Sequence, residues 1–282
     1  GWDRNPPLVY LWMIANRRRF RGFHIVHVHD TLPLLLWYLP LLVMDSATPV
    51  YATFHGFERD PVPAIFKLLR KIARWLVSGS ICIGHFIPET YGVDCDVILT
   101  GATDCIDLVE QPRNGAVFVG RLEQDTRLLE YIKAIAILEE THGIEMPLAL
   151  CGTGSLQKEA SNLAVSKGIT MEQMGLVSNP QAVMNSNQIC LAAGYLSILE
   201  AMSLGLPVIG IARSPLKAAY LKGVLKDGGP ISIQTTPEGV AREIARIIND
   251  PHLAARIAEQ GKRFASKMSW NRMTRAYLDL WT

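Results

Sequence analysis

Residues 192–209 read AAGYLSILEAMSLGLPVI, a turn of small residues that leads into a helical stretch and then into an apolar strand. Gly194, Tyr195 and Leu196 fall at the start of the expected helix, where backbone N–H groups and the helix dipole favour an anion. Glu200 lies about one turn further along, and its acceptor-only carboxylate could bind two ribose hydroxyls. The alternative is an ordinary helix carboxylate in a salt bridge. The stretch predicts an α/β protein with a phosphate-binding turn.

Strands and helices alternate through the rest of the chain. We expect strands at residues 24–30, 50–56, 80–84, 116–120, 147–152, 174–177, 189–193 and 207–212, and helices at 64–77, 128–138, 155–166 and from Pro180. Asn179, Thr236 and Asp250 each precede a proline, which places a capping side chain ahead of a proline at the first helical position. The alternation predicts parallel sheets, whose ligands gather beyond the carboxyl ends of the strands.

The chain of 282 residues is long enough for two domains, each with its own core. Proline and glycine interrupt the pattern at EQPRNG, residues 110–115, and a second α/β series follows. We therefore place an N-terminal Rossmann-like domain at 1–111, a C-terminal one at 112–266, and a final helix at 267–282 that packs back on the N-terminal domain. The N-terminal domain opens with GWDRNPP, so we expect its first strand to be missing.

Composition and charge exclude several classes of protein. Apolar residues make up 49% of the chain and charged residues 19%, as in globular enzymes. A net charge of +2 gives no bulk attraction to nucleic acid, so we expect no nucleic-acid partner. The five cysteines lack the spacing of a zinc site or a disulfide framework, which favours a reducing, cytoplasmic setting. The longest apolar run, residues 32–44, is too short to span a bilayer.

Two more strand-to-helix turns have the character of ligand-binding loops. GRLEQD, residues 120–125, places Arg121 directly after a strand, where a fixed cation and backbone N–H groups can hold a diphosphate. CGTGSL, residues 151–156, brings Gly152 and Gly154 to a turn where the backbone can approach a ligand. A surface arginine and a plain tight turn are the respective alternatives. Three such loops in one domain are more persuasive than any of them singly.

The segments FVGRLEQD, LALCGTGSL, GYLSILEAMSLGLPVI and SWNRMTRAYLDLW resemble the C-terminal nucleotide-sugar domain of GT-B glycosyltransferases of family 4. VHVHD and ATFHGFE resemble the N-terminal half of the same family, and the segments occur in the family's order and spacing. The resemblance covers nearly the whole chain. It implies a GT-B fold of two facing Rossmann-like domains with parallel sheets. It also implies retention of configuration and a need for neither metal nor cofactor beyond the donor substrate.

The resemblance also assigns roles to individual residues. Arg121 matches the family's arginine that binds the donor diphosphate. Glu200 matches the second acid of the E-x7-E motif, which holds the ribose. His55 matches a histidine that lies near the transferred sugar. We expect these three to be the catalytic residues. The nucleotide-sugar-binding residues that we expect are Arg121, Arg127, Gly152, Gly154, Val177, Ala192, Gly194, Tyr195, Leu196 and Glu200.

The sequence departs from the family pattern at two positions. Thr126 stands where the family has a lysine, five positions after the arginine, and Ala192 replaces the first acid of E-x7-E. In the family that acid contacts the donor sugar, so its loss puts the sugar contact in doubt. Arg127 could supply the missing cation.

We therefore expect a retaining, metal-independent hexosyltransferase that moves a sugar from a nucleotide diphosphate sugar to a glycan or lipid-linked acceptor in the interdomain cleft. One alternative is a catalytically weak homologue that acts as a binding or scaffold subunit, which Ala192 and Thr126 favour. Another is a nucleotide-sugar epimerase of similar fold, which would need acids in the cleft to move protons.

A metal site at His27, His29 and Asp30 is a further interpretation, because imidazole and carboxylate are good metal ligands. In a strand, however, the two histidines face one side and Asp30 the other. The metal-free family also argues against it. We expect these residues to serve as cleft or structural groups and predict no metal.

The helix at 64–77 is amphipathic in sequence. One side carries the cations Lys67, Arg70, Lys71 and Arg74, and the other carries Ile65, Leu68, Leu69, Ile72, Trp75 and Leu76. Basic amphipathic helices can lie on anionic membranes, and NRRRFRG, residues 16–22, adds arginines nearby in sequence. The alternative is a helix packed on its sheet with a solvated basic face. The first interpretation predicts a cytoplasmic protein that is peripheral on the inner face of the membrane.

Overall fold

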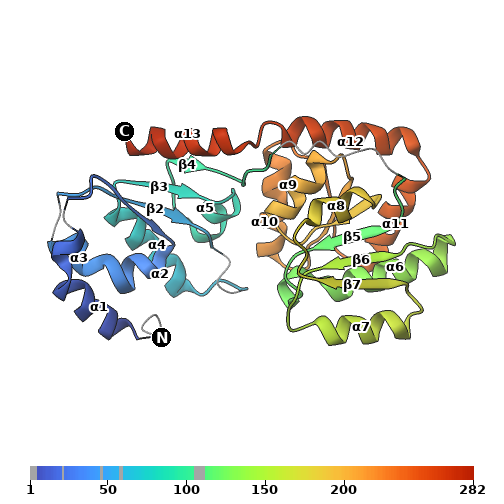
Figure 1. Cartoon of the computed structure of the whole chain (residues 1–282), viewed down its shortest axis with the longest axis horizontal. Helices are drawn as coiled ribbons and strands as arrows, with labels where there is room; N and C mark the ends of the chain where they lie inside the picture. Colours follow the sequence, from blue (N-terminus) through green and yellow to red (C-terminus); the bar gives the residue numbers. More distant parts are fainter. Residues whose placement is uncertain (1–4, 21, 45–46, 57–59, 105–111) are drawn as a thin grey trace. The chain divides into compact units, whose positions relative to one another are not determined.

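The computed structural model describes residues 5–20, 22–44, 47–56, 60–104 and 112–282. Contacts divide the chain into unit 1, Gly1–Leu99 with Thr274–Thr282, and unit 2, Thr100–Met273 (Figure 1). The domain boundary predicted at residue 111 lies outside the described residues. Within the described residues, no helix is both long enough and apolar enough to cross a bilayer.

Unit 1 contains a parallel four-stranded sheet in the order β1-β2-β3-β4. Val26 pairs with Val50, and β2 is buried along its whole length because it carries apolar residues on both faces. The elements are α1 (Pro6–Ala15), η2 (Arg17–Phe20), β1 (Val26–His29), α2 (Thr31–Pro33), η3 (Leu34–Tyr38), α3 (Leu39–Met44), β2 (Val50–Phe54), α4 (Ala64–Leu76), β3 (Gly79–Cys82), α5 (Phe86–Tyr91) and β4 (Val97–Ile98).

The C-terminal helix α13 (Trp270–Trp281) ends on the sheet of unit 1. The indole Nε1 of Trp281 donates to Nδ1 of His27 at 2.9 Å, and the Tyr277 hydroxyl lies 2.9 Å from Oγ1 of Thr53. Because an indole N–H only donates, Nδ1 of His27 must accept, so in the neutral ring Nε2 carries the proton toward Thr53, 2.8 Å away. Burial, and then the charge of His29, lower the pKa of His27 to about 4. These bonds fix the last turns of α13 on β1 and β2.

Unit 2 contains a parallel six-stranded sheet in the order β10-β9-β8-β5-β6-β7 (Figure 1). The chain starts at β5, runs outward to β7, and returns to the other side of β5 as β8. Its elements are β5 (Ala116–Val119), η4 (Gln124–Thr126), α6 (Leu128–His142), β6 (Leu148–Cys151), α7 (Gln157–Ser166), β7 (Met171–Gly175), α8 (Pro180–Asn185), β8 (Ile189–Leu191), α9 (Tyr195–Ser203), β9 (Val208–Ile211), α10 (Pro215–Lys226), β10 (Ile231–Gln234), α11 (Pro237–Ile248) and α12 (Pro251–Ala265). Such a sheet binds ligands where the strand order reverses, which here is at the carboxyl ends of β5 and β8.

Local signals placed most of these elements. The side chains of Asn179, Thr236 and Asp250 cap α8, α11 and α12 as predicted, each accepting from a backbone N–H three residues on. The strand predicted at 174–177 was wrong in its limits, because β7 runs from Met171 to Gly175. Gly175 has a φ of +66°, which ends the extended conformation before the exposed Leu176.

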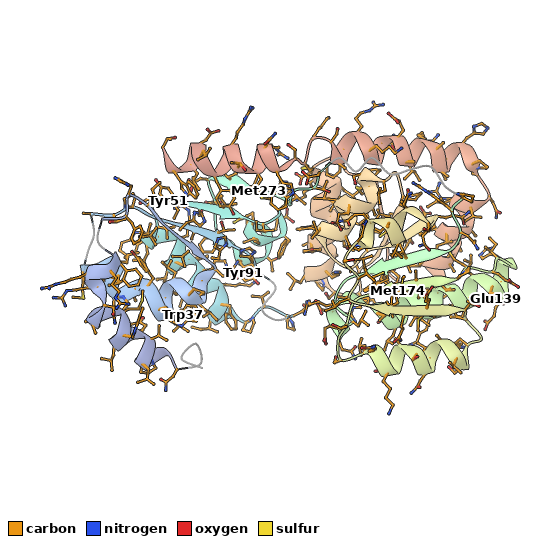
Figure 2. The ribbon with its side chains drawn as sticks, in the orientation of Figure 1. Trp37, Tyr51, Tyr91, Glu139, Met174 and Met273 are labelled. Carbon is orange, nitrogen blue, oxygen red and sulfur yellow. The ribbon has the colours of Figure 1, made fainter. Side chains whose placement is uncertain are left out.

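Helix α4 contradicts the prediction of a solvated basic face. Arg70 is wholly buried: its guanidinium donates to Oδ1 of Asp30 at 3.1 Å and lies 4.1 Å from the ring centre of Tyr91, which Figure 2 labels. Arg74 is partly exposed and pairs with the Asp96 carboxylate at 3.1 Å. The exposed surface of α4 carries an apolar stripe that consists of Ile65, Leu68, Ile72 and Trp75, with Lys67 and Lys71 exposed beside it.

Candidate functional site

The loops that follow β5 and β8 touch at the point where the strand order of unit 2 reverses. A Cβ placed on Gly120 would lie only 2.6 Å from Cβ of Ala193, so the two loops are in direct contact. Arg121 follows Gly120, and the first turn of α9 follows Ala193. The sequence-predicted arginine and the small-residue turn of α9 therefore belong to neighbouring loops.

The loop after β6 packs on the loop after β5 through its two glycines. A Cβ on Gly152 would lie 1.9 Å from the carbonyl oxygen of Gly120, and one on Gly154 would lie 2.4 Å from that of Leu122. Gly152 also has a φ of +140°. These glycines permit backbone to approach backbone, so the tight-turn interpretation explains them without a ligand. By holding the β5 loop in place they also position Arg121.

A hollow of about 270 Å³ opens at the carboxyl ends of β5 and β6. Its lining residues are Val119, Gly120, Arg121, Cys151, Gly152, Thr153, Gly175, Leu176, Val177 and Pro180. Three predicted site residues, Arg121, Gly152 and Val177, thus share one hollow. Two larger hollows of about 400 and 480 Å³ lie at the amino ends of the strands, where sheets of this type do not place their ligands.

Arg121 presents an exposed cation at this hollow. Its guanidinium donates to Oδ2 of Asp125 at 2.8 Å, yet the side chain remains 71% exposed. An ion pair that is this exposed contributes little to stability. The guanidinium can therefore exchange its carboxylate partner for a phosphate at small cost, and it offers the planar donors that bind phosphate in a bidentate manner.

The amino end of α9 is already occupied by protein groups. The N–H of Gly194 donates to Oγ of Ser197 at 3.3 Å, and that of Tyr195 donates to the hydroxyl of Tyr220 at 2.7 Å. The rings of Tyr195 and Tyr220 are stacked with centroids 3.9 Å apart. For Leu196 the structure gives no such acceptor among the described residues. An anion at this end would meet the Leu196 amide directly and would displace Tyr220 to reach the Tyr195 amide.

Glu200 lies in α9 and is buried. Its Oε1 accepts a hydrogen bond from Nε2 of Gln181 at 2.6 Å, and burial raises the pKa of its carboxyl, an effect that the Gln181 bond opposes. Gln181 directly follows Pro180, which lines the hollow. The second carboxylate oxygen remains an acceptor for hydroxyl groups.

The two positions that depart from the family pattern are buried. Ala192 is wholly buried, and its carbonyl accepts from the hydroxyl of Tyr131 at 3.1 Å. Thr126 is also buried, and its hydroxyl donates to the carbonyl of Glu123. Arg127 lies 3.6 Å from Glu130, which Arg213 shares at the same distance. Neither Ala192 nor Thr126 offers a ligand contact, and the charge of Arg127 is partly balanced.

Unit 1 brings His29 and His55 together at the carboxyl ends of β1 and β2. Nδ1 of His29 lies 3.1 Å from Nε2 of His55, within hydrogen-bonding distance. Burial lowers the pKa of His55; the charge of Asp30 opposes this, while those of His29 and Arg70 add to it. A ring that stays neutral near pH 7 can accept or donate a hydrogen bond to a sugar.

The three residues considered for a metal are engaged by protein groups. His27 bonds Trp281, His29 bonds His55, and Asp30 accepts from both Thr31 N–H and Arg70. Asp30 lies just beyond β1 with a φ of +78°, so the alternation expected of a strand does not extend to it. Among the described residues no group of three or more His, Cys, Asp and Glu side chains is placed to hold a metal ion.

The sequence profile described as "Glycosyl transferases group 1" matches residues 108–264, more than half of the chain. This chain belongs to that family. The resemblance seen in its sequence segments is confirmed.

Relatives of this glycosyl transferase group 1 chain agree with the assignment. A Campylobacter jejuni protein, GalNAc-alpha-(1->4)-GalNAc-alpha-(1->3)-diNAcBac-PP-undecaprenol alpha-1,4-N-acetyl-D-galactosaminyltransferase, is 19% identical over 233 residues, which are 77% of this chain and 63% of the relative. A crystal structure of a Rickettsia africae glycosyltransferase covers 99% of this chain and 82% of its own, with 16% identity and a TM-score of 0.75. The likeness to a Staphylococcus aureus TarM variant, crystallised with UDP among its ligands, covers 99% of this chain and 59% of the TarM chain, with 14% identity and a TM-score of 0.74.

This likeness confirms the predicted fold class, an α/β fold of the GT-B type with two parallel sheets. The chain spans 63% of the length of the Campylobacter relative. The site residues themselves are placed by the structure of this chain and not by its relatives.

Sequence patterns missed Gln181, Tyr220 and Lys217, which the structure brings to this family's expected donor loops. Gln181 follows the proline at a predicted helix start, so its place at the end of a loop was visible but its contact with Glu200 was not. For Lys217 the available signal was its position three residues after Ser214, which precedes a proline and caps α10 after the apolar strand β9.

Proposed function

We propose that this chain is a retaining, metal-independent glycosyltransferase of the hexosyltransferase type. It transfers a sugar from a nucleoside diphosphate sugar to a glycan or lipid-linked acceptor. The observation that carries the proposal is the hollow at the strand-order reversal of unit 2, where an exposed guanidinium, Arg121, adjoins glycine turns. Family membership supports it, as does the lipid-linked substrate in the name of the Campylobacter relative.

In this reaction the bond between the anomeric carbon and the diphosphate breaks, a bond from that carbon to an acceptor oxygen forms, and the departing diphosphate takes up the proton of the acceptor hydroxyl. Negative charge develops on the departing diphosphate. Arg121 would stabilise that charge, and Glu200 would accept hydrogen bonds from the ribose. His55, kept neutral by burial, would hydrogen-bond the reacting sugar.

A donor panel tests the proposal. UDP-, GDP- and ADP-sugars are offered to the protein together with lipid-linked and oligosaccharide acceptors, and both the released nucleoside diphosphate and the anomeric configuration of the product are measured. The assay is repeated in excess EDTA. Release that depends on acceptor, gives a retained product and survives EDTA supports every part of the proposal. An inverted product or loss of activity in EDTA contradicts the corresponding part.

Replacing Glu200 by Gln should weaken nucleoside diphosphate binding by about 1–3 kcal/mol, because hydrogen bonds to a charged acceptor are worth that much. The measurement is calorimetric titration of both proteins with the preferred nucleotide. Glu243→Gln is the control, since Glu243 is another largely buried helix carboxylate, paired with Arg246 on α11 and away from the hollow. Unchanged affinity in a folded Glu200→Gln protein would remove this residue from the site.

A second candidate function is a catalytically weak binding subunit. The observation that favours it is the burial of Ala192 and Thr126, which leaves two family contacts without a counterpart at their own positions. In that case the donor panel gives nucleotide binding without turnover, and the free nucleoside diphosphate binds as tightly as the intact donor. A donor that binds a hundredfold tighter, worth about 2.7 kcal/mol, contradicts this candidate because the sugar then has strong contacts.

We also propose that the protein is peripheral on an anionic membrane face, through α4. The proposed contact surface differs from the basic face expected from the sequence. It is the apolar stripe of α4, which faces solvent with Trp75 83% exposed, and the exposed Lys67 and Lys71 lie beside it. Apolar residues flanked by lysines match the boundary between acyl chains and anionic headgroups. Lys67 and Lys71 supply the charge complementarity, while Arg70 and Arg74 are used inside unit 1.

Replacing Leu68 and Trp75 together by Gln should reduce binding to anionic liposomes at least about thirtyfold, since burying one large apolar side chain contributes about 1.5–3 kcal/mol. Cosedimentation measures this, and Val165→Gln serves as the control because Val165 is an equally exposed apolar residue on unit 2. High salt should weaken wild-type binding without abolishing it, since the lysines add only about 1 kcal/mol each. Equal pelleting of wild type and the double variant would mean that the stripe does not meet the membrane.

A further inference from the structure

Lys217 is a buried cation in unit 2. It lies in the first turn of α10 and is only 4% exposed. Its Nζ donates to the carbonyl oxygen of Ala193 at 3.1 Å and lies 4.9 Å from the ring centre of Tyr220. The lysine therefore reaches from the β9 side of the sheet to the loop that follows β8.

Burying an ammonium group costs free energy, because the charge loses its hydration and protein groups must replace the water. Burial accordingly lowers the pKa of Lys217 to about 8; the charge of Asp125 opposes this, while those of Arg127 and Arg121 add to it. The positive charges of the β5–α6 segment thus act on the same small region as Lys217. A dianionic ligand would relieve both the desolvation and the mutual repulsion.

The ammonium lies against one of the candidate donor loops, the loop that follows β8, although Lys217 is not among the residues that line the hollow. Ala193, whose carbonyl it contacts, is the residue that Gly120 touches, and Arg121 follows Gly120. Two cations from different strands, Arg121 after β5 and Lys217 after β9, therefore flank the contact between the β5 and β8 loops. Tyr220, which stacks on Tyr195 at the start of α9, covers the lysine from its own helix.

We propose that Lys217 binds the diphosphate of the donor together with Arg121. The inference rests on the proposed function and names a residue that takes part in it. Lys217 supplies the cation that the family's lysine would provide at the position occupied here by Thr126. Its Nζ would release the Ala193 carbonyl, or share it, and donate to a phosphate oxygen.

Arg127 is the competing source of that cation. It follows Thr126 directly, but its guanidinium lies 3.6 Å from Glu130 and its φ of +62° sets the start of α6. Its Nε is buried and has no hydrogen-bond partner among the described residues. Arg127→Gln is therefore the variant to compare with Lys217→Met.

The test is calorimetric titration with UDP, GDP and ADP. Lys217→Met removes the charge at similar side-chain length and should lower the affinity for the preferred nucleoside diphosphate about tenfold to a hundredfold. Lys222→Gln, an exposed lysine on the same helix, should bind as the wild type does. Lys217→Arg keeps the charge and provides a second variant if the methionine protein is unstable; it should bind within a few-fold of the wild type.

A pH profile separates a phosphate contact from a merely structural role. Since the ammonium form is lost as the pH rises through about 8, wild-type affinity should fall about tenfold between roughly pH 7 and pH 9, whereas Lys217→Met should show no such fall. The charges of Asp125, Arg121 and Arg127 act on Lys217, and its ammonium lies over the ring of Tyr220, whose pKa is raised by burial away from this window.

The outcomes distinguish this inference from the function on which it rests. If the wild type binds none of the three nucleotides, the proposed function fails and the inference fails with it. If the wild type binds but Lys217→Met binds equally well with the same pH profile, the inference alone is overturned. A loss seen with Arg127→Gln and not with Lys217→Met would assign the cation to Arg127.

Discussion

Replacing Arg121 by Gln should lower kcat for the preferred donor by roughly 100- to 1000-fold, the usual cost of removing one group that stabilises developing negative charge. The side chain of Arg121 is 71% exposed, so its loss should leave the thermal midpoint of the protein nearly unchanged. Initial rates at saturating donor, with melting curves in parallel, measure the two effects.

Arg246→Gln is the matched control for this prediction. Arg246 is also an exposed arginine, paired with Glu243 at 2.8 Å along a helix of the same unit, but it does not line the hollow. Its replacement should leave kcat within about twofold, as expected for a surface substitution. If Arg121→Gln and Arg246→Gln behave alike, the developing diphosphate charge is stabilised elsewhere and the assignment of the hollow is wrong.

Replacing Gly152 by Ala should destabilise unit 2 by about 3 kcal/mol or more. The added Cβ would lie 1.9 Å from the carbonyl oxygen of Gly120, and the φ of +140° is one that other residues rarely adopt. The β5 and β6 loops would have to separate, and Arg121 would move with them. Chemical denaturation measures the free energy of unfolding.

Gly194→Ala provides the contrast. Gly194 has a φ of −154°, and the nearest atom to an added Cβ is the Tyr220 hydroxyl at 3.5 Å, an ordinary van der Waals distance. Its replacement should change stability by less than about 1 kcal/mol. Equal losses in the two variants would mean that the β6 loop is not held by the close approach at Gly152.

Local sequence signals predicted the features that depend on neighbours in the chain. The caps at Asn179, Thr236 and Asp250 need only the following turn, and each is present. The strands of unit 2 appear close to their predicted places because runs of apolar residues suffice to define buried parallel strands. The limits of β7 were misjudged, because polar residues 172 and 173 interrupt the apolar run, and β10 was not predicted at all.

Features that depend on distant residues were not predictable in the same way. Periodicity separated the two sides of α4 but could not say which side is covered, because Arg70 is drawn inward by Asp30, which lies 40 positions earlier. The contacts of Glu200 with Gln181 and of Lys217 with Ala193 likewise join different elements. The family resemblance predicted that Arg121, Gly152 and Val177 belong to one site. These residues line the same hollow because the folded sheet brings their three loops together.

The division of the chain also bears on the order in which it folds during synthesis. Domains generally fold as they leave the ribosome, the N-terminal one first. Here most of unit 1 precedes unit 2 in the chain, but unit 1 also includes Thr274–Thr282, so all of unit 2 is synthesised before Trp281 can bond His27. During that interval β1 and β2 of the nascent chain lack their contacts with α13. The unit that is translated first is therefore completed last.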